Sequence, residues 1–168
     1  MVPKVDSYRF VEGISRRVMR HWAGFRALRP IPWTPLPKPL EECTIALVSS
    51  AALALSIDRP FDAEVERLDP WTSDASYRVL PAAAATGQIQ VCHRHINPSF
   101  GLQDLDSVMP LPSLVQLAKI GEIGRPAASH YSFMGYTLRP ERLLTETVPA
   151  ISALMHQEQV DAVLLVPV

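Results

Sequence analysis

Two histidines stand two residues apart in IQVCHRHINPSF, residues 89–100 of the chain. In an extended strand such residues point to the same side, so His93 and His95 would share one face while Cys92 and Arg94 face the other. Imidazole titrates near neutral pH and can exchange a proton with a substrate. We therefore take His93 and His95 as candidate acid–base or substrate-orienting residues. A pair of hydrogen-bonded structural histidines is the alternative.

A second polar cluster lies in AASHYSFMGY, residues 127–136. If this segment is a strand, His130 and Ser132 face one side and Tyr131 faces the other. His130 is a third candidate catalytic residue, and Tyr131 and Ser132 are candidate substrate-binding residues. No GxSxG elbow accompanies Ser132, so a Ser-His-Asp triad is not predicted. A buried strand with a hydrogen-bonded histidine is the alternative, and residue type alone favours it.

A metal site built from the same three histidines would lack a carboxylate or thiolate at a diagnostic spacing, so no metal is predicted. The two cysteines, Cys43 and Cys92, are far apart and form no CxxC motif. This pattern argues against a disulfide scaffold and favours a reducing cytoplasm.

The strands that would position these residues are apolar runs. CTIALVSS, residues 43–50, predicts a strand that ends in Ser49 and Ser50, which are candidate substrate-binding residues at a strand-to-helix turn. No GxGxxG follows, so a dinucleotide site is not supported. VDAVLLVPV, residues 160–168, predicts a strand buried on both faces of a parallel sheet. In open α/β sheets, ligands bind outside the carboxyl ends of such strands.

The remaining elements are predicted from periodicity and from breaker residues. Ser113 and Gln116 match a capping box for a helix that stops at Gly121. The other predictions are a basic amphipathic helix at Ser7–Leu28, a proline-rich arm at Arg29–Leu40, a loop with little regular structure at Ala52–Ser76, a short strand at Tyr77–Leu80, and a helix at Pro140–Gln157 that Pro149 kinks.

Together these elements predict an α/β fold, with a mainly parallel, Rossmann-like sheet and helices. Residues 1–40 would form an amphipathic helix and arm, and residues 41–168 a single α/β domain. Hydrophobic residues make up 48% of the 168, enough for a packed core. Lys+Arg 16 against Asp+Glu 17 argues against a nucleic-acid partner. No run approaches the ~18 apolar residues of a membrane span, and the first residues resemble no signal peptide.

Several segments, taken in order, resemble one family. PWTPLPKPL, CTIALVSSA, SYRVLP, HRHINPS, DLDSVMPLPSLVQLAKIGEIG, HYSFMGY and VDAVLLVPV are similar to the selenoprotein B component family of glycine, sarcosine and betaine reductases and D-proline reductase. The HYSFMG and VDAVLLVPV segments are the most specific. The resemblance implies reductive cleavage of a carbon–nitrogen bond in a small amino acid or amine, with a dithiol as electron source and partner subunits in some members.

The resemblance also implies a redox-active selenocysteine or cysteine directly after the strand that matches VDAVLLVPV. The given sequence ends at Val168, so this residue would have to follow it. We hypothesise that a UGA selenocysteine codon was read as a stop. No other cofactor is expected in this chain. The alternative function is a non-catalytic binding or assembly protein that docks a partner or membrane surface through the basic helix Ser7–Leu28.

Overall fold

A computed structural model describes residues 12–25, 34–69 and 71–168. The chain divides into two compact units, Met1–Pro35 and Leu36–Val168. Within the first unit, helix α1 spans Gly13–Phe25. Of the predicted helix Ser7–Leu28, Glu12 is described but lies before α1, and positions 7–11 and 26–28 lie outside the described residues, as do positions 29–33 of the predicted arm. In the second unit, a short 3₁₀ turn, η1 (Leu40–Glu42), leads into the sheet.

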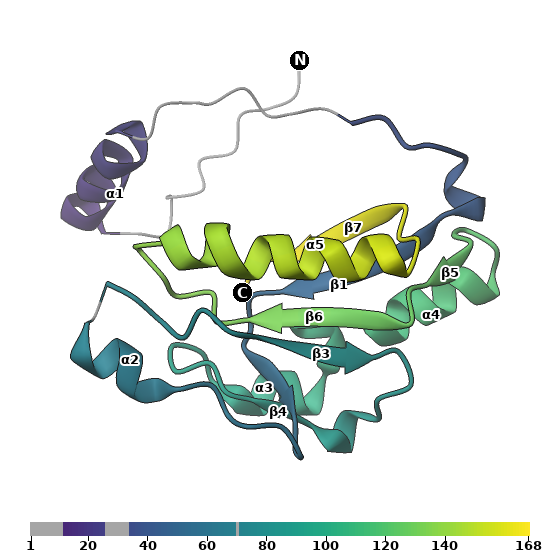
Figure 1. Ribbon diagram of the computed structural model, residues 1–168. Coiled ribbons are helices and arrows are strands. Elements are labelled where there is room, and N and C mark those ends of the chain that lie inside the picture. The colour runs from purple at the N-terminus through teal and green to yellow at the C-terminus, as the bar shows by residue number, and fades with distance from the viewer. Residues whose placement is uncertain (1–11, 26–33, 70) are drawn as a thin grey trace. The chain divides into compact units, whose positions relative to one another are not determined.

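The second unit is built on a mainly parallel sheet, which confirms the predicted α/β class (Figure 1). Strand β1 (Thr44–Ser49) pairs in parallel with β7 (Ala162–Val166) along one edge, and with β5 (Arg125–Pro126) and β6 (Ser129–Phe133) along the other. Strand β3 (Tyr77–Pro81) pairs antiparallel with β6. β1 therefore has both of its edges occupied, and β7 and β3 bound the sheet.

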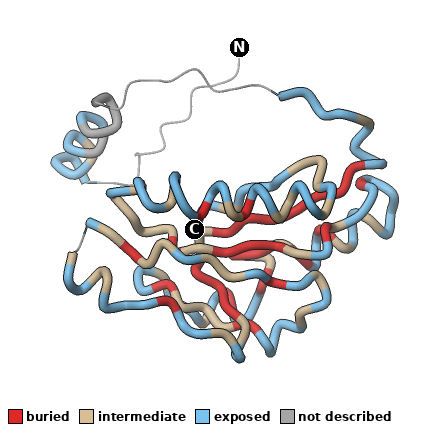
Figure 2. Tube along the Cα trace, in the orientation of Figure 1, coloured by how far each residue is buried: buried red, intermediate tan, exposed pale blue. Residues whose placement is uncertain are grey.

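β1 is buried along its whole length, as Figure 2 shows for the centre of the sheet. Its alternate side chains belong to different cores, as the two-residue repeat of a strand requires. Ile45 and Leu47 pack in a cluster with Leu111 and Leu114 of helix α4 (Leu111–Lys119). Val48 packs with Ile151 of helix α5 (Val148–Gln157). The two helices thus cover opposite faces of the sheet.

The segment Ala52–Ser76, predicted to lack regular structure, is partly ordered, so that prediction was wrong. It contains strand β2 (Leu53–Leu55) and helix α2 (Ala63–Leu68). β2 pairs antiparallel with β4 (Ile89–Val91), and helix α3 (Pro98–Gln103) follows. The carboxylate of Asp62 caps α2 by accepting from the Glu64 N–H at 2.9 Å. The scattered prolines and aspartates, taken as loop signals, are here a helix cap and turn residues.

The other predicted helices differ from the structure at their starts. α4 begins at Leu111, and Ser113 does not cap it: the Ser113 hydroxyl donates to Asp106 at 2.7 Å. Gly121, at φ 79°, follows its end as expected. Before α5 the helix is wound as a π-turn, Leu143–Thr147. Pro149 lacks the N–H that a regular α-helix would direct to the carbonyl of Thr145, which agrees with the π-turn directly before it. The kink expected at Pro149 stays a prediction.

The prediction that the terminal strand is buried on both faces was wrong. Among the described residues, β7 pairs only with β1, and the Leu165 side chain is 70% exposed. Short apolar runs occur both in central strands and in edge strands. The run alone therefore does not show which position in the sheet the strand takes. Within the described part of the chain, no helix is long and apolar enough to cross a membrane.

The different burial of two leucine side chains predicts that shortening each one to alanine lowers the stability by different amounts. Leu47 in β1 is fully buried, whereas Leu165 in β7 is largely exposed. Leu47→Ala should lower the free energy of unfolding by about 2–5 kcal/mol, and Leu165→Ala by less than about 1 kcal/mol. Urea denaturation monitored by circular dichroism measures both. Equal losses would contradict the edge position of β7.

Candidate functional site

The carboxyl ends of β1 and β7 meet at one edge of the sheet, because the two strands are parallel. Ser50, directly after β1, holds the end of the terminal segment. Its backbone N–H donates to the Val166 carbonyl at 3.1 Å, and its hydroxyl accepts from the Val168 N–H at 2.8 Å. Val168 therefore lies beside Ser50 at the edge where α/β sheets collect their ligands.

The segment after β6 reaches the same edge through Gly135. Its N–H donates to the Ser50 carbonyl at 2.9 Å. A Cβ atom at Gly135 would lie 2.6 Å from the Ser50 Cβ, so only glycine permits this approach. The next residue, Tyr136, is therefore fixed near the ends of β1 and β7.

Tyr136 contacts a hydrogen-bonded histidine–carboxylate pair. The His95 ring lies 4.2 Å from the Tyr136 ring, and its Nε2 is 2.7 Å from Glu66 Oε1. A carboxylate only accepts hydrogen bonds, so Nε2 carries the proton and donates it to Glu66. The Glu66 side chain is only 12% exposed, and Arg94 approaches its other oxygen at 3.7 Å. The pair thus orients the imidazole and leaves its Nδ1 available for proton transfer.

His93 is packed behind His95, with the two rings edge to face at 5.8 Å. Its Nδ1 accepts from the His95 N–H at 3.1 Å. Burial, with the nearby His95 adding to it, lowers the pKa of His93. β4 ends at Val91, so the prediction of a shared strand face was wrong: His93 lies in the irregular segment that follows β4, and His95 in the turn after it. The structure still brings them together.

His130 is placed elsewhere, inside β6 and without exposed surface. Its Nδ1 accepts from the Leu47 N–H at 3.0 Å, between the two strands. Burial lowers the pKa of His130 to about 4, so the ring is neutral at neutral pH. Among the described residues its Nε2 has no partner. The sheet thus uses His130 as a backbone acceptor, the structural alternative considered above, and the structure does not group it with His93 and His95.

The candidate substrate-binding residues also divide into buried and edge positions. Ser49 donates to the Val108 carbonyl at 2.6 Å, and Ser132 donates to the Ser49 carbonyl at 3.1 Å. Tyr131 is fully buried between β1 and α5, and burial raises the pKa of its hydroxyl to about 12. Ser50 alone of these four candidates lies at the carboxyl edge beside Val168.

The sequence analysis did not select two residues of this site. Glu66 lies in helix α2, which was predicted as a loop. Tyr136 ends the segment 127–136, from which only His130, Tyr131 and Ser132 were selected.

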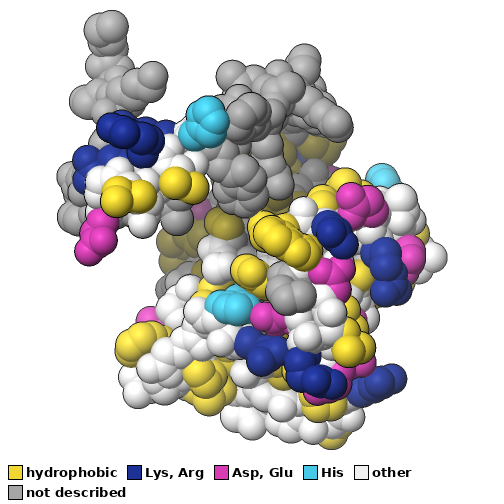
Figure 3. All heavy atoms as spheres, turned by 90° about the vertical axis from the view of Figure 1, so that its left-hand side faces the viewer, with side chains coloured by type: hydrophobic (Ala, Val, Ile, Leu, Met, Phe, Trp, Pro, Cys, Tyr) yellow, Lys and Arg dark blue, Asp and Glu magenta, His cyan; other side chains and the backbone are white. Residues whose placement is uncertain are grey.

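Basic and acidic side chains are interspersed over this side of the unit (Figure 3). Among residues 12–25, 34–69 and 71–168, no group of three His, Cys, Asp or Glu is placed to hold a metal ion.

Comparison with known proteins gives one informative match. Over 136 residues the chain is 32% identical to D-proline reductase subunit gamma of Acetoanaerobium sticklandii. The match covers 81% of this chain and 53% of that protein, so the chain spans about half the length of the curated relative it matches. No family model matches the chain, and no solved structure matches it. The similarity supports a relationship to a reductase family.

The buried histidines predict a loss of stability in mild acid. The pKa of His130 is about 4 in the folded chain against an ordinary value of 6.5. The unfolded chain therefore binds more protons between these values, so stability is complete above pH 6.5 and falls as the pH drops toward 4. The expected loss from His130 is about 2–3 kcal/mol, and His93 adds to it in the same direction.

Urea denaturation at several pH values measures this loss, and NMR titration of the imidazole protons assigns it. His156→Gln, which removes an exposed histidine and leaves His130 in place, is the control, and the loss of stability assigned to His130 should persist in this variant. A His130 ring that titrates near 6.5 in the folded chain would contradict its burial as a neutral acceptor.

Proposed function

We propose that this chain is part of a reductase that cleaves a carbon–nitrogen bond of a small amino acid or amine, using a selenol or thiol. The observation that carries the proposal is the similarity to D-proline reductase subunit gamma over 81% of the chain. The finer resemblance to the selenoprotein B component family rests on the segments quoted above. The proposal also includes partner subunits, because the relative's name describes one component of an assembly.

The proposed reactive residue is a selenocysteine or cysteine directly after Val168. Two features of the described residues suit such a group. Val168 is hydrogen-bonded to Ser50 at the carboxyl edge of the parallel strands. The His95–Glu66 pair reaches the same edge through Tyr136 and Gly135. When present, a selenolate or thiolate there would supply the nucleophile and one electron-carrying site.

The net reaction balances with a dithiol. The carbon–nitrogen bond breaks, and the carbon and nitrogen each gain one hydrogen. The dithiol loses two electrons and two protons and becomes a disulfide. In this scheme the His95 ring acts as the imidazolium: Nδ1 delivers its proton to the leaving nitrogen, which is general acid catalysis, while Nε2 keeps its proton in the hydrogen bond to Glu66. Glu66 is the positioning residue, because its carboxylate holds Nε2 of the ring and directs Nδ1 outward.

The first test is the nucleotide sequence downstream of the Val168 codon. We expect a UGA codon that is followed, in frame, by a cysteine-containing segment and an amphipathic helix. A cysteine codon at the same place would also support the proposal. A second stop codon immediately after the first, or an unrelated reading frame, would refute the reactive residue proposed here.

The second test separates the histidines in the extended protein, assayed with a dithiol and candidate amino acids. If His95 is the acid, His95→Gln should lower kcat by roughly 100-fold or more, while His156→Gln should not. Glu66→Gln should lower kcat less, because it disturbs the orientation of the ring without removing the proton donor. An equally large loss in His130→Ala, with folding and stability retained, would return the acid role to His130.

A further inference from the structure

Positive and negative charges are divided unequally between the two compact units of the chain. Residues 1–35 contain seven Lys and Arg against two Asp and Glu, which gives a net charge of +5. Residues 36–168 contain nine Lys and Arg against 15 Asp and Glu, which gives a net charge of −6. The overall charge of −1 therefore conceals a basic first unit. A charge asymmetry of this kind indicates an interaction with an anionic polymer or surface.

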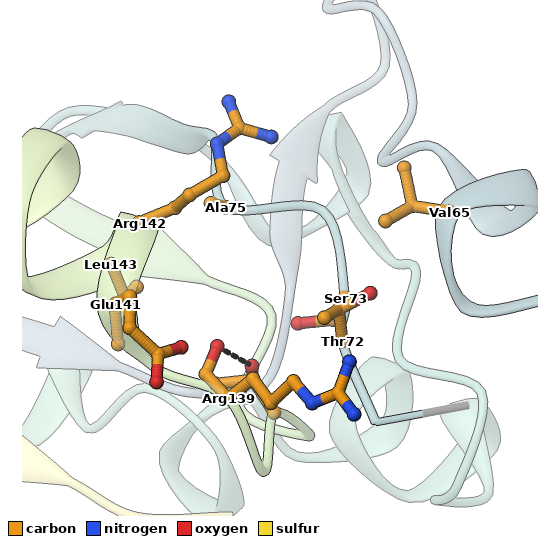
Figure 4. Close-up of a pocket in the computed structure, with 9 residues that line it drawn as sticks. Val65, Thr72, Ser73, Ala75, Arg139, Glu141, Arg142 and Leu143 are labelled. Carbon is orange, nitrogen blue, oxygen red and sulfur yellow. Dashed lines mark hydrogen bonds between the residues drawn. The ribbon is translucent and has the colours of Figure 1, made fainter. Parts of the chain in front are cut away.

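In the second unit, acidic side chains offset basic side chains locally. Three exposed arginines of this unit each form an ion pair, at 2.6–3.0 Å, in the pairs Arg67–Glu64, Arg139–Asp69 and Arg142–Glu146. Figure 4 shows Arg139 and Arg142 at a small pocket whose lining also includes Glu141. The excess of basic charge therefore lies in the first unit.

Helix α1 of the first unit combines arginines with an exposed apolar stripe. The helix contains Arg16, Arg17 and Arg20 and no acidic residue. Ile14 and Val18 lie one helical turn apart on the same face, and they are 84% and 62% exposed. With 3.6 residues per turn, Arg16 and Arg20 lie across the helix from this stripe, and Arg17 lies at its border. Figure 3 shows apolar and basic side chains next to one another on the helix.

Both faces of this helix suit the surface of a lipid bilayer. Anionic headgroups attract arginines, and apolar side chains gain by leaving water for the acyl chains. A nucleic acid would bind the arginines through its phosphates and leave Ile14 and Val18 in water. The helix has 13 residues and is about 20 Å long, shorter than the ~30 Å hydrocarbon core of a bilayer. With three arginines it would therefore lie along the surface rather than cross the membrane.

We propose that α1 binds the anionic surface of a lipid membrane, with Ile14 and Val18 among the acyl chains and the three arginines at the phosphate groups. The surface would attract the basic first unit and repel the acidic second unit, which orients the chain. The segments that resemble the reductase family all begin at Pro32 or later, so α1 precedes them. The membrane contact is therefore independent of the proposed reaction and needs no residue after Val168.

Co-sedimentation of residues 1–168 with lipid vesicles tests this contact. We expect the chain to bind vesicles of equal parts phosphatidylcholine and phosphatidylglycerol, and to bind phosphatidylcholine vesicles at least roughly 10-fold more weakly. Binding should also fall when the salt concentration rises from about 0.1 M to 1 M, because the Debye length shrinks from about 10 Å to 3 Å. Equal binding to both kinds of vesicle, or no binding to either, would overturn the proposal.

Two triple variants with the same loss of charge locate the contact. The first replaces the arginines of α1, by Arg16→Gln, Arg17→Gln and Arg20→Gln. It should bind anionic vesicles roughly 100-fold more weakly, because each basic residue at such a surface contributes about fivefold. The control replaces exposed arginines of the second unit, by Arg67→Gln, Arg139→Gln and Arg142→Gln, and should bind nearly as well as the unaltered chain. Equal losses in both variants would show that net charge rather than α1 attracts the chain, and would overturn the proposal.

A further variant tests the apolar stripe. Ile14→Ser together with Val18→Ser should weaken vesicle binding roughly 10-fold or more, whereas Ile57→Ser, at a 90% exposed position of the second unit, should not. Serine has nearly the helix propensity of isoleucine and valine, and circular dichroism shows whether each variant keeps its helix content and unfolding midpoint. Unchanged vesicle binding by the folded double variant would overturn the membrane contact. Binding of polyuridylate as tightly as of vesicles would identify a nucleic-acid site instead, and would also overturn it.

Discussion

The structure depends on the burial of β1, a strand paired along both edges and covered on both faces. Every backbone group of such a strand needs a partner, because no water reaches it. Between Ile45 and Val48 of β1, the neighbouring chain from Pro126 to Tyr131 takes two more residues, so the ladder is interrupted there. The His130 ring fills this interruption and accepts the Leu47 N–H.

The same burial encloses polar residues of the sheet. His130 accepts from the Leu47 N–H, Ser132 donates to the Ser49 carbonyl, and Ser49 donates to the Val108 carbonyl before α4. His95, whose side chain is 44% exposed, lies instead beyond the strand ends. The turn after β4 and the segment after β6 occupy that position, and they carry His95 and Tyr136.

The carboxyl edge thus brings together two features from distant parts of the chain. Ser50 holds Val168, and the Glu66 carboxylate orients His95, whose ring contacts Tyr136. The proposed reaction needs a nucleophile and a proton donor near one another. The close approach of Gly135 to Ser50 is what brings the segment after β6 to the end of β1.

The sequence alone predicted the α/β class, strands within residues 43–50, 77–80 and 127–136, and the resemblance to a reductase family, because apolar periodicity and segment order are local properties. It also indicated His93 and His95 as neighbours. Only the tertiary structure decided which histidine is enclosed, because His130 and His95 have the same chemistry until a strand encloses one and a carboxylate orients the other. The positions of Glu66 and Tyr136 beside His95 depend on contacts between segments far apart in the chain, and the spacing of residues in the sequence does not reveal such contacts.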